Sequence, residues 1–100
     1  MADLEELLKN DDKVYVRVNE DRMPDGTLLL NHFYWEDGRK CIINRVTDIR
    51  PSHSTKAGGF GIRYTVDFSI EGEDAPRSYT KYLFLEEDRW FMERERPHHT

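Results

Sequence analysis

A glycine-rich stretch near the middle of the chain is the first place where residue types and spacing point to chemistry. Gly58, Gly59 and Gly61 follow one another closely, and backbone N–H groups beside such glycines can converge on one point and bind an anion. Lys56 and Arg63 add a positive charge at each end. The stretch lacks the Gly-Lys-Ser/Thr ending of a P-loop, and its spacing differs from the dinucleotide fingerprint. A small anion or a nucleotide is therefore one predicted ligand, with a plain turn between two strands as the alternative.

Basic side chains gather in the same part of the sequence. Residues 39–63 hold six lysines and arginines and a single acidic residue, Asp48, although the chain has a formal net charge of −5. Small barrels bind single-stranded nucleic acid through a positive groove lined with aromatic rings, which Tyr34 or Phe60 would supply here. The predicted ligand-binding residues are Arg39, Arg45, Arg50, Lys56, Gly58, Gly59, Phe60 and Arg63. The alternative is that these charges only solvate the outer faces of strands, and the net negative charge opposes approach to a polyanion.

Aromatic residues at the ends of predicted strands form a second candidate surface. They are Tyr15, Tyr34, Trp35 and Trp90. Rings at the rim of a small barrel can hold an extended, proline-rich segment, as they do in SH3 domains. The spacing therefore allows an aromatic groove for a peptide, whereas the simpler interpretation is that the two tryptophans cap the core.

Residues of the kinds used in catalysis or metal binding are few. Cys41 falls on the apolar alternation of its strand, so a thiol–imidazole pair with His32 or His53 is not expected, because buried thiols are usually inert. His98 and His99 are adjacent in sequence and lack the facing geometry of a metal site. We predict no catalytic residue, no metal site and no cofactor, and therefore a protein that is not an enzyme.

The apolar residues predict the strands that position these groups. Every second residue is apolar from Ile62 to Ile70, which is typical of a half-buried strand. Between Ile43 and Val46 the apolar spacing changes from two to three, which indicates a β-bulge near residues 44–45. Pro24-Asp25-Gly26 and Asp37-Gly38 are turn signals that mark hairpins. The predicted strands cover residues 13–19, 27–35, 40–50, 62–70, 79–86 and 90–94, with a polar connection at 51–61.

Five or six short strands without a long helix exclude a parallel α/β sheet, since parallel strands need long crossover connections. We therefore predict an all-β fold, a small antiparallel SH3-like barrel over residues 13–94. Leucines at positions 4, 7 and 8 lie on one face of a helix, so residues 1–12 are predicted to form a short amphipathic helix that docks on the barrel or binds a partner. Residues 95–100 are predicted to form a flexible tail.

Two motifs in this domain resemble those of known proteins. The first is Trp-Glu-Asp-Gly-Arg at residues 35–39, and the second is Lys-Ala-Gly-Gly-x-Gly-x-Arg-Tyr-Thr at residues 56–65. In these motifs the chain resembles a family of short uncharacterised bacterial proteins, mainly from Firmicutes, and the resemblance spans residues 35–93. It implies a small β-barrel but no activity, ligand or site residue.

Composition also limits where the chain works and what it binds. No apolar run reaches the roughly 18 residues that a membrane span requires, and the acidic first ten residues do not match a secretory signal. The single cysteine excludes an intramolecular disulfide. We expect a cytoplasmic, non-enzymatic interaction module that binds another protein rather than a membrane, as a monomer or as a homodimer formed at an open strand edge near residues 14–18. The alternatives are nucleic acid at residues 39–63 and a small anion or nucleotide at the glycine-rich loop.

Overall fold

A computed structural model describes residues 13–53, 60–75 and 77–94, of which Phe60 and His53 are described by their backbone only. These ranges contain seven strands and no helix. The predicted helix in residues 1–12 and the predicted tail at 95–100 lie outside the described residues. In chain order the strands are β1 (Lys13–Tyr15), β2 (Arg17–Arg22), β3 (Leu28–Tyr34), β4 (Lys40–His53), β5 (Phe60–Ile70), β6 (Tyr79–Glu86) and β7 (Arg89–Glu93).

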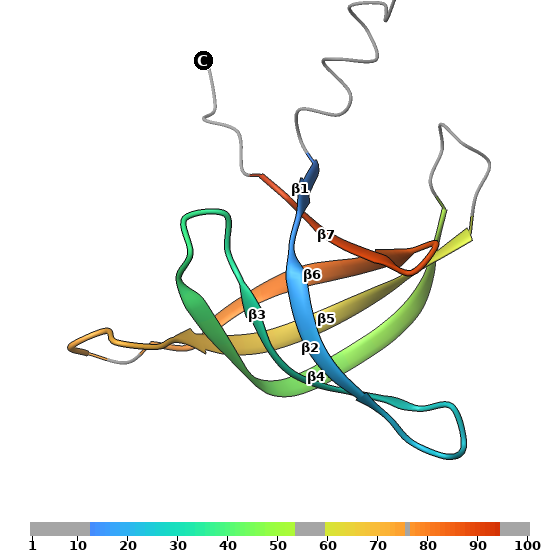
Figure 1. Cartoon of the computed structure of the whole chain (residues 1–100), viewed down its shortest axis with the longest axis horizontal. Coiled ribbons are helices and arrows are strands. Elements are labelled where there is room, and N and C mark those ends of the chain that lie inside the picture. Colours follow the sequence, from blue (N-terminus) through green and yellow to red (C-terminus); the bar gives the residue numbers. More distant parts are fainter. Residues whose placement is uncertain (1–12, 54–59, 76, 95–100) are drawn as a thin grey trace, which may run out of the picture.

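All seven strands belong to one antiparallel sheet with the order β1-β7-β6-β5-β4-β3-β2 (Figure 1). The two edge strands are consecutive in the sequence and are separated only by Val16, whose N–H donates to the Trp90 carbonyl at 3.1 Å. One chain segment therefore supplies both edges of a strongly curved sheet, a half-barrel. The prediction of an antiparallel all-β fold is confirmed. The predicted strand number is too low, because the first expected strand is divided at Val16 into β1 and β2.

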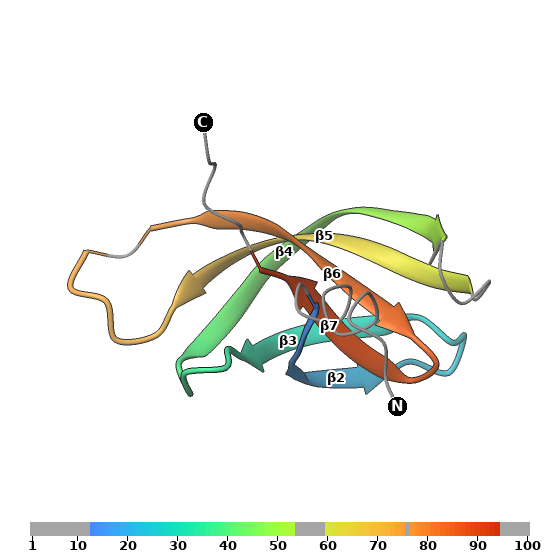
Figure 2. The ribbon, with the colours of Figure 1, turned by 90° about the horizontal axis from the view of Figure 1, so that it is seen from above.

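The concave face of the sheet carries the core. In Figure 2 the sheet curls so that β2 and β3 face β4 and β5. The Phe33 ring from β3 meets the Phe68 ring from β5 edge-on, with centroids 5.1 Å apart. Burial of each such side chain contributes about 1.5–3 kcal/mol, so packing across this face holds the curvature. The buried cluster comprises Leu30, Phe33, Cys41, Ile43, Tyr64, Val66, Phe68, Leu83, Trp90 and Met92.

β4 is bent by two β-bulges. The register against β5 shifts between Ile43 and Arg45, as the sequence predicts, and shifts again between Val46 and Asp48. β4 also extends to His53 and β5 begins at Phe60, so the predicted connection at 51–61 is too long at both ends. Pro51 fits within this strand because β4 pairs with β3 only over residues 40–42, which leaves the other edge open beside the proline.

Turn chemistry sets the hairpin geometry. Both predicted turns contain a glycine with positive φ, Gly26 at 92° and Gly38 at 89°. The carboxylate before each glycine accepts the N–H of the residue after it: Asp25 from Thr27 at 2.9 Å, and Asp37 from Arg39 at 3.0 Å. These two hairpins are confirmed.

Candidate functional site

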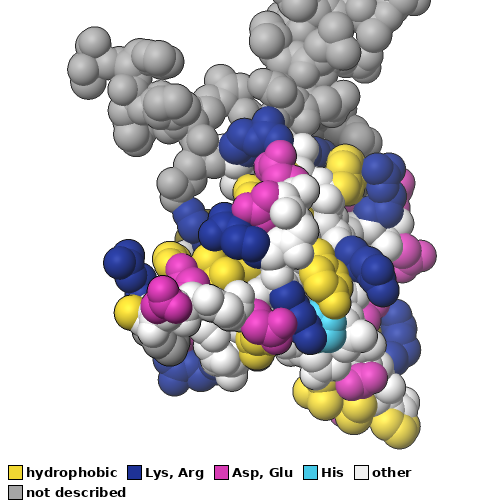
Figure 3. All heavy atoms as spheres, turned by 60° about the vertical axis from the view of Figure 1, so that its left-hand side comes forward, with side chains coloured by type: hydrophobic (Ala, Val, Ile, Leu, Met, Phe, Trp, Pro, Cys, Tyr) yellow, Lys and Arg dark blue, Asp and Glu magenta, His cyan; other side chains and the backbone are white. Residues whose placement is uncertain are grey.

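The basic residues predicted to bind a ligand are divided between two places. Arg45, Arg50 and Arg63 lie on the outer face of β4 and β5, whereas Arg39 lies in the β3–β4 turn. Figure 3 shows basic and acidic side chains interspersed on one face of the molecule rather than gathered by sign. Of the remaining predicted residues, Lys56, Gly58 and Gly59 lie outside the described residues, and Phe60 is described only as the first residue of β5.

Each of the described arginines in this set lies beside an aspartate. An oxygen of Asp67 lies 3.0 Å from Arg45 Nη2. One oxygen of Asp48 lies 2.8 Å from Arg50 Nε and 3.9 Å from Arg63 Nη2. In the β3–β4 turn, Arg39 Nε lies 2.7 Å from an oxygen of Asp37. The positive charge predicted for this segment is therefore largely balanced within the sheet itself.

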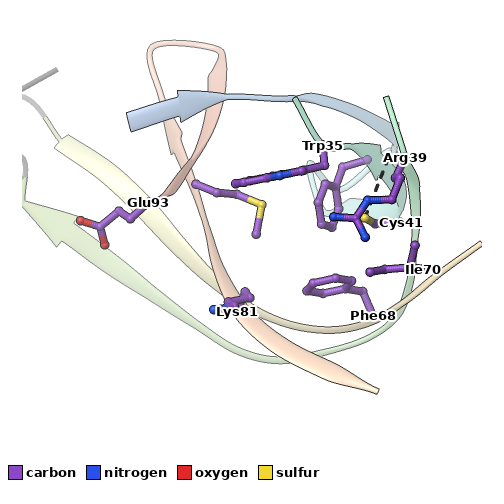
Figure 4. A pocket seen from close by; sticks show the side chains of 9 residues that line it. Trp35, Arg39, Cys41, Phe68, Ile70, Lys81 and Glu93 are labelled. Carbon is purple, nitrogen blue, oxygen red and sulfur yellow. Dashed lines mark hydrogen bonds between the residues drawn. The ribbon is translucent and has the colours of Figure 1, made fainter. Parts of the chain in front are cut away.

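The four aromatic residues predicted to form a groove do not come together. Trp90 is only 7% exposed and packs in the core against Tyr64, with ring centroids 5.2 Å apart. Trp35 and Arg39 line a cavity at one end of the half-barrel (Figure 4). Tyr34 is half-buried next to the guanidinium of Arg17. Only Tyr15 lies on an open face of the sheet, with 51% of its surface exposed.

Tyr15 belongs to a different aromatic surface. Tyr82 and Phe84 point outward from β6, and Phe91 points outward from β7, because their neighbours Leu83 and Trp90 fill the core. Phe84 and Phe91 are cross-strand partners, and so are Phe91 and Tyr15. The rings touch in sequence across three strands: Tyr82 to Phe84 at 6.2 Å, Phe84 to Phe91 at 5.0 Å and Phe91 to Tyr15 at 5.9 Å between centroids. We call these four residues the outer aromatic strip.

Three cations lie on the rings of the strip. The guanidinium of Arg63 is 4.4 Å from the centroid of Tyr82, and that of Arg89 is 4.1 Å from the centroid of Tyr15. The Lys13 ammonium is 4.7 Å from the Phe91 centroid and 3.6 Å from a Glu86 oxygen. Such contacts are worth about 0.5–1 kcal/mol each at exposed sites. In the described part of the chain no carboxylate pairs with Arg89.

Exposure differs along the strip. Tyr82 is 47% exposed and Tyr15 is 51% exposed, whereas Phe91 is only 4% exposed. The two tyrosines therefore offer ring surface at each end of a strip whose centre is closely packed. Aromatic and arginine side chains in this arrangement are typical of the residues that dominate binding energy at protein interfaces.

The titratable groups near the sheet do not form a catalytic arrangement. Burial raises the pKa of the Cys41 thiol, although nearby Arg39 acts in the opposite direction, so the thiol is neutral at physiological pH. Cys41 is paired across the sheet with Phe33, and His32 precedes Phe33 on the opposite face of β3, away from the thiol. Among the described residues no three His, Cys, Asp or Glu side chains lie close enough together to hold a metal ion. In the same residues no helix is long and apolar enough to cross a membrane.

Comparison with protein-family models, with curated proteins and with solved structures finds no match to this chain. The resemblance to short bacterial proteins therefore stays a prediction. Sequence reasoning missed the exposed Tyr82 and the outward direction of Phe84 and Phe91. A signal was present, because residues 82–85 are all apolar, and such a run in one strand places apolar side chains on both faces of a sheet.

Proposed function

We propose that this protein is a non-enzymatic interaction module that binds a segment of another protein on its outer aromatic strip. One observation carries the proposal: four aromatic rings touch in a row across β6, β7 and β1, and Arg63 and Arg89 lie over the tyrosines at its two ends. Because neighbouring strands already fix these rings, a partner would immobilise few side chains on binding, which lowers the entropic cost of association.

The chemistry of the strip selects the kind of partner. Ring faces bind proline and aliphatic side chains well, and the exposed rings belong to Tyr15 and Tyr82. Arg89, which lacks a carboxylate partner in the described residues, would pair with an acidic side chain of the ligand. The favoured ligand is therefore an extended, proline-rich segment that carries acidic residues. In keeping with this mode of recognition, we propose that the half-barrel is a small SH3-like barrel and that it works in the cytoplasm.

Single-stranded nucleic acid is the second candidate, because bases also stack on exposed tyrosines beside arginines. It is less favoured for two reasons. The net charge is −5, and the arginines at positions 45, 50 and 63 each lie within 4 Å of an aspartate oxygen. A polyanion would have to displace these aspartates or accept their repulsion.

The test is a titration of the ¹⁵N-labelled protein with two probes, a peptide of alternating proline and glutamate and a short oligothymidylate. We expect the peptide to shift the amide resonances of Tyr15, Tyr82 and Arg89. Tyr82→Ser should abolish the shifts because it removes an exposed ring. Ile49→Ser is the matched control, since Ile49 is 55% exposed but lies on β4 and faces away from the strip.

The outcomes separate the two candidates. If only oligothymidylate shifts the amide resonances, and these shifts disappear as salt is raised, the ligand is nucleic acid and not a protein segment. Equal loss of peptide binding in Tyr82→Ser and Ile49→Ser would overturn the assignment to the strip. In a pull-down from lysate, partners that resist nuclease and are retained by Ile49→Ser but lost by Tyr82→Ser would be the physiological ligands.

A further inference from the structure

A cavity of about 210 Å³ opens at one end of the half-barrel, on the opposite side of β7 from the outer aromatic strip. It lies where β3 and β5 end and where β4 and β6 begin. Phe91 faces outward into the strip, and the next residue, Met92, faces inward and lines the cavity. The two surfaces are therefore independent, and nothing about the cavity depends on the proposed protein partner.

The inside of the cavity is apolar. Phe33, Cys41, Phe68 and Met92 are all at most 6% exposed and form its inner part, and Trp35 and Ile70 complete the wall. A space of this size takes a ligand of about ten non-hydrogen atoms, smaller than a typical drug-like molecule. Because the neutral Cys41 thiol adds little polarity, an aliphatic chain or a single aromatic ring suits this part.

Positive charge is directed to the mouth of this apolar space. In Figure 4 the guanidinium of Arg39 turns inward between Trp35 and Ile70, whereas the carboxylate of Glu93 points away. Lys81 also lines the cavity, because it is paired with Val66 on the core-facing register of β5 and β6. A lysine at such a position is unusual, since the register otherwise holds apolar residues.

Nearby carboxylates leave part of the Arg39 guanidinium for a ligand. Asp37 engages only the Nε–H, through a hydrogen bond of 2.7 Å, and within the described residues the two terminal nitrogens donate no hydrogen bond. Glu73, a further acid near Cys41, accepts the Tyr79 hydroxyl at 3.0 Å. Two parallel N–H donors match the two oxygens of a carboxylate.

We propose that this cavity binds a small apolar carboxylate, a medium-chain aliphatic or single-ring aromatic acid, with its apolar body against Phe33, Phe68 and Met92. Its carboxylate pairs with the terminal nitrogens of Arg39. The inference joins three observations that are independent of one another: a defined volume, an apolar interior and an inward-turned guanidinium at the mouth.

The probes are octanoate and, as a neutral molecule of similar size, 1-octanol. The readout is the ¹³C-labelled methionine methyl spectrum of the full chain, because Met92 lines the cavity whereas Met23 lies in the β2–β3 turn and serves as an internal control. We expect octanoate at millimolar concentration to shift the Met92 methyl signal and to leave Met23 unchanged. Octanol should bind at least about tenfold more weakly than octanoate.

Variants separate the charge from the volume. Arg39→Gln should weaken octanoate binding about tenfold and leave octanol unaffected, because it removes a charge-assisted pair. Arg45→Gln is the matched control, an exposed arginine that also pairs with an aspartate but lies on the outer face. Ile70→Trp should fill the cavity and abolish binding of both probes, and a melting temperature recorded for each variant confirms that it is folded.

Three results would overturn the proposal. The first is a Met92 signal that does not respond to octanoate in the unmodified chain. The second is equal affinity for octanoate and octanol together with no effect of Arg39→Gln, which would exclude a carboxylate ligand. The third is an equal response of Met23 and Met92, which would indicate adsorption of the probe to the surface.

Discussion

Phe84 and Phe91 stack across β6 and β7 with their ring centroids 5.0 Å apart and only 8° between the ring planes. They are direct cross-strand partners on the outer face of the sheet, where a solvated face normally carries polar side chains. The pair therefore forms the centre of the outer aromatic strip, and we expect it to stabilise the β6–β7 hairpin.

A double-mutant cycle measures this contribution. Phe84→Leu and Phe91→Leu keep much of the apolar volume but remove the ring pair, so we expect a coupling free energy of about 1 kcal/mol from urea unfolding of the two single variants and the double variant. A cycle between Phe84→Leu and Ile49→Ala, whose side chains lie on opposite faces of the sheet, should give a coupling close to zero. Additive effects at positions 84 and 91 would show that the stacked geometry adds nothing beyond burial.

Asp67 makes stability depend on pH. Thr80 donates to one carboxylate oxygen of Asp67 at 2.7 Å and Arg45 to the other at 3.0 Å, and these two bonds, that from Thr80 first, lower the pKa of Asp67. Since the pKa of Asp67 is lower in the folded state, its carboxylate stabilises the fold fully at pH values above the ordinary pKa of an aspartate. This stabilisation is lost as pH falls through that value toward the lowered folded-state pKa.

We therefore expect Asp67→Asn to lower the urea midpoint at neutral pH and to change it much less near about pH 3. Asp74→Asn is the control, because Asp74 is exposed in the β5–β6 connection. Asp67→Asn proteins that lose the same stability at both pH values would contradict the assigned cause. An NMR titration of Asp67 in Thr80→Val should also show a higher pKa than in the unmodified chain.

The β6–β7 turn stores backbone strain that substitution can remove. Glu87 and Asp88 both have positive φ, 49° and 65°, in a two-residue turn between the paired residues Glu86 and Arg89. Such turns favour Asn-Gly, because side-chain-bearing residues pay a steric cost in this region. The double substitution Glu87→Asn and Asp88→Gly should raise the unfolding free energy by about 1 kcal/mol.

Gly38→Ala provides the opposite test of the same argument. Gly38 has a φ of 89°, and a Cβ there would meet no atom within 4 Å, so any loss of stability comes from the backbone alone. We expect a loss of about 1 kcal/mol. The double variant of the β6–β7 turn has its own contradicting outcome. If Glu87→Asn combined with Asp88→Gly melts below the unmodified protein, then interactions of Glu87 and Asp88 outweigh the strain of their positive φ angles.

Alternation in the sequence predicts the strands and the inner face well. Tyr64, Val66 and Phe68 alternate along β5, and all three are buried as the period of two requires. The same alternation identifies the first bulge of β4. It also carries a signal for the second bulge, since Val46 and Ile49 are again three residues apart.

The outer aromatic strip and the cavity depend on information that no single strand carries. Phe84 meets Phe91 through the pairing of β6 with β7, whereas Phe91 meets Tyr15 only because β1 pairs with β7. This second pairing joins residues about 75 positions apart, so its cost is set by the entropy of loop closure and not by a local sequence pattern. For Trp90, which begins a strand, the sequence allows either a place in a groove at the rim or a cap on the core, and the structure buries it in the core. It faces the core because Phe91 takes the outer position, and periodicity cannot decide between two adjacent aromatic residues.

Cys41 gives a direct measure of how closed the inner face is. Its side chain is buried, with the residue 3% exposed, and burial raises the pKa of its thiol, so both access and thiolate formation are suppressed in the folded state. We expect alkylation by iodoacetamide at mildly alkaline pH to be at least about 100-fold slower in the folded protein than in urea, because the thiol in the cavity wall has little exposed surface and forms a thiolate less readily than in the unfolded chain. The control is Cys41→Ala combined with Arg45→Cys, which places an exposed thiol on the same strand and should react as fast folded as unfolded. Rapid modification of Cys41 in the folded state would contradict this expectation, and it would mean that reagents reach the sulfur through the mouth of the cavity or through separation of β3 and β4.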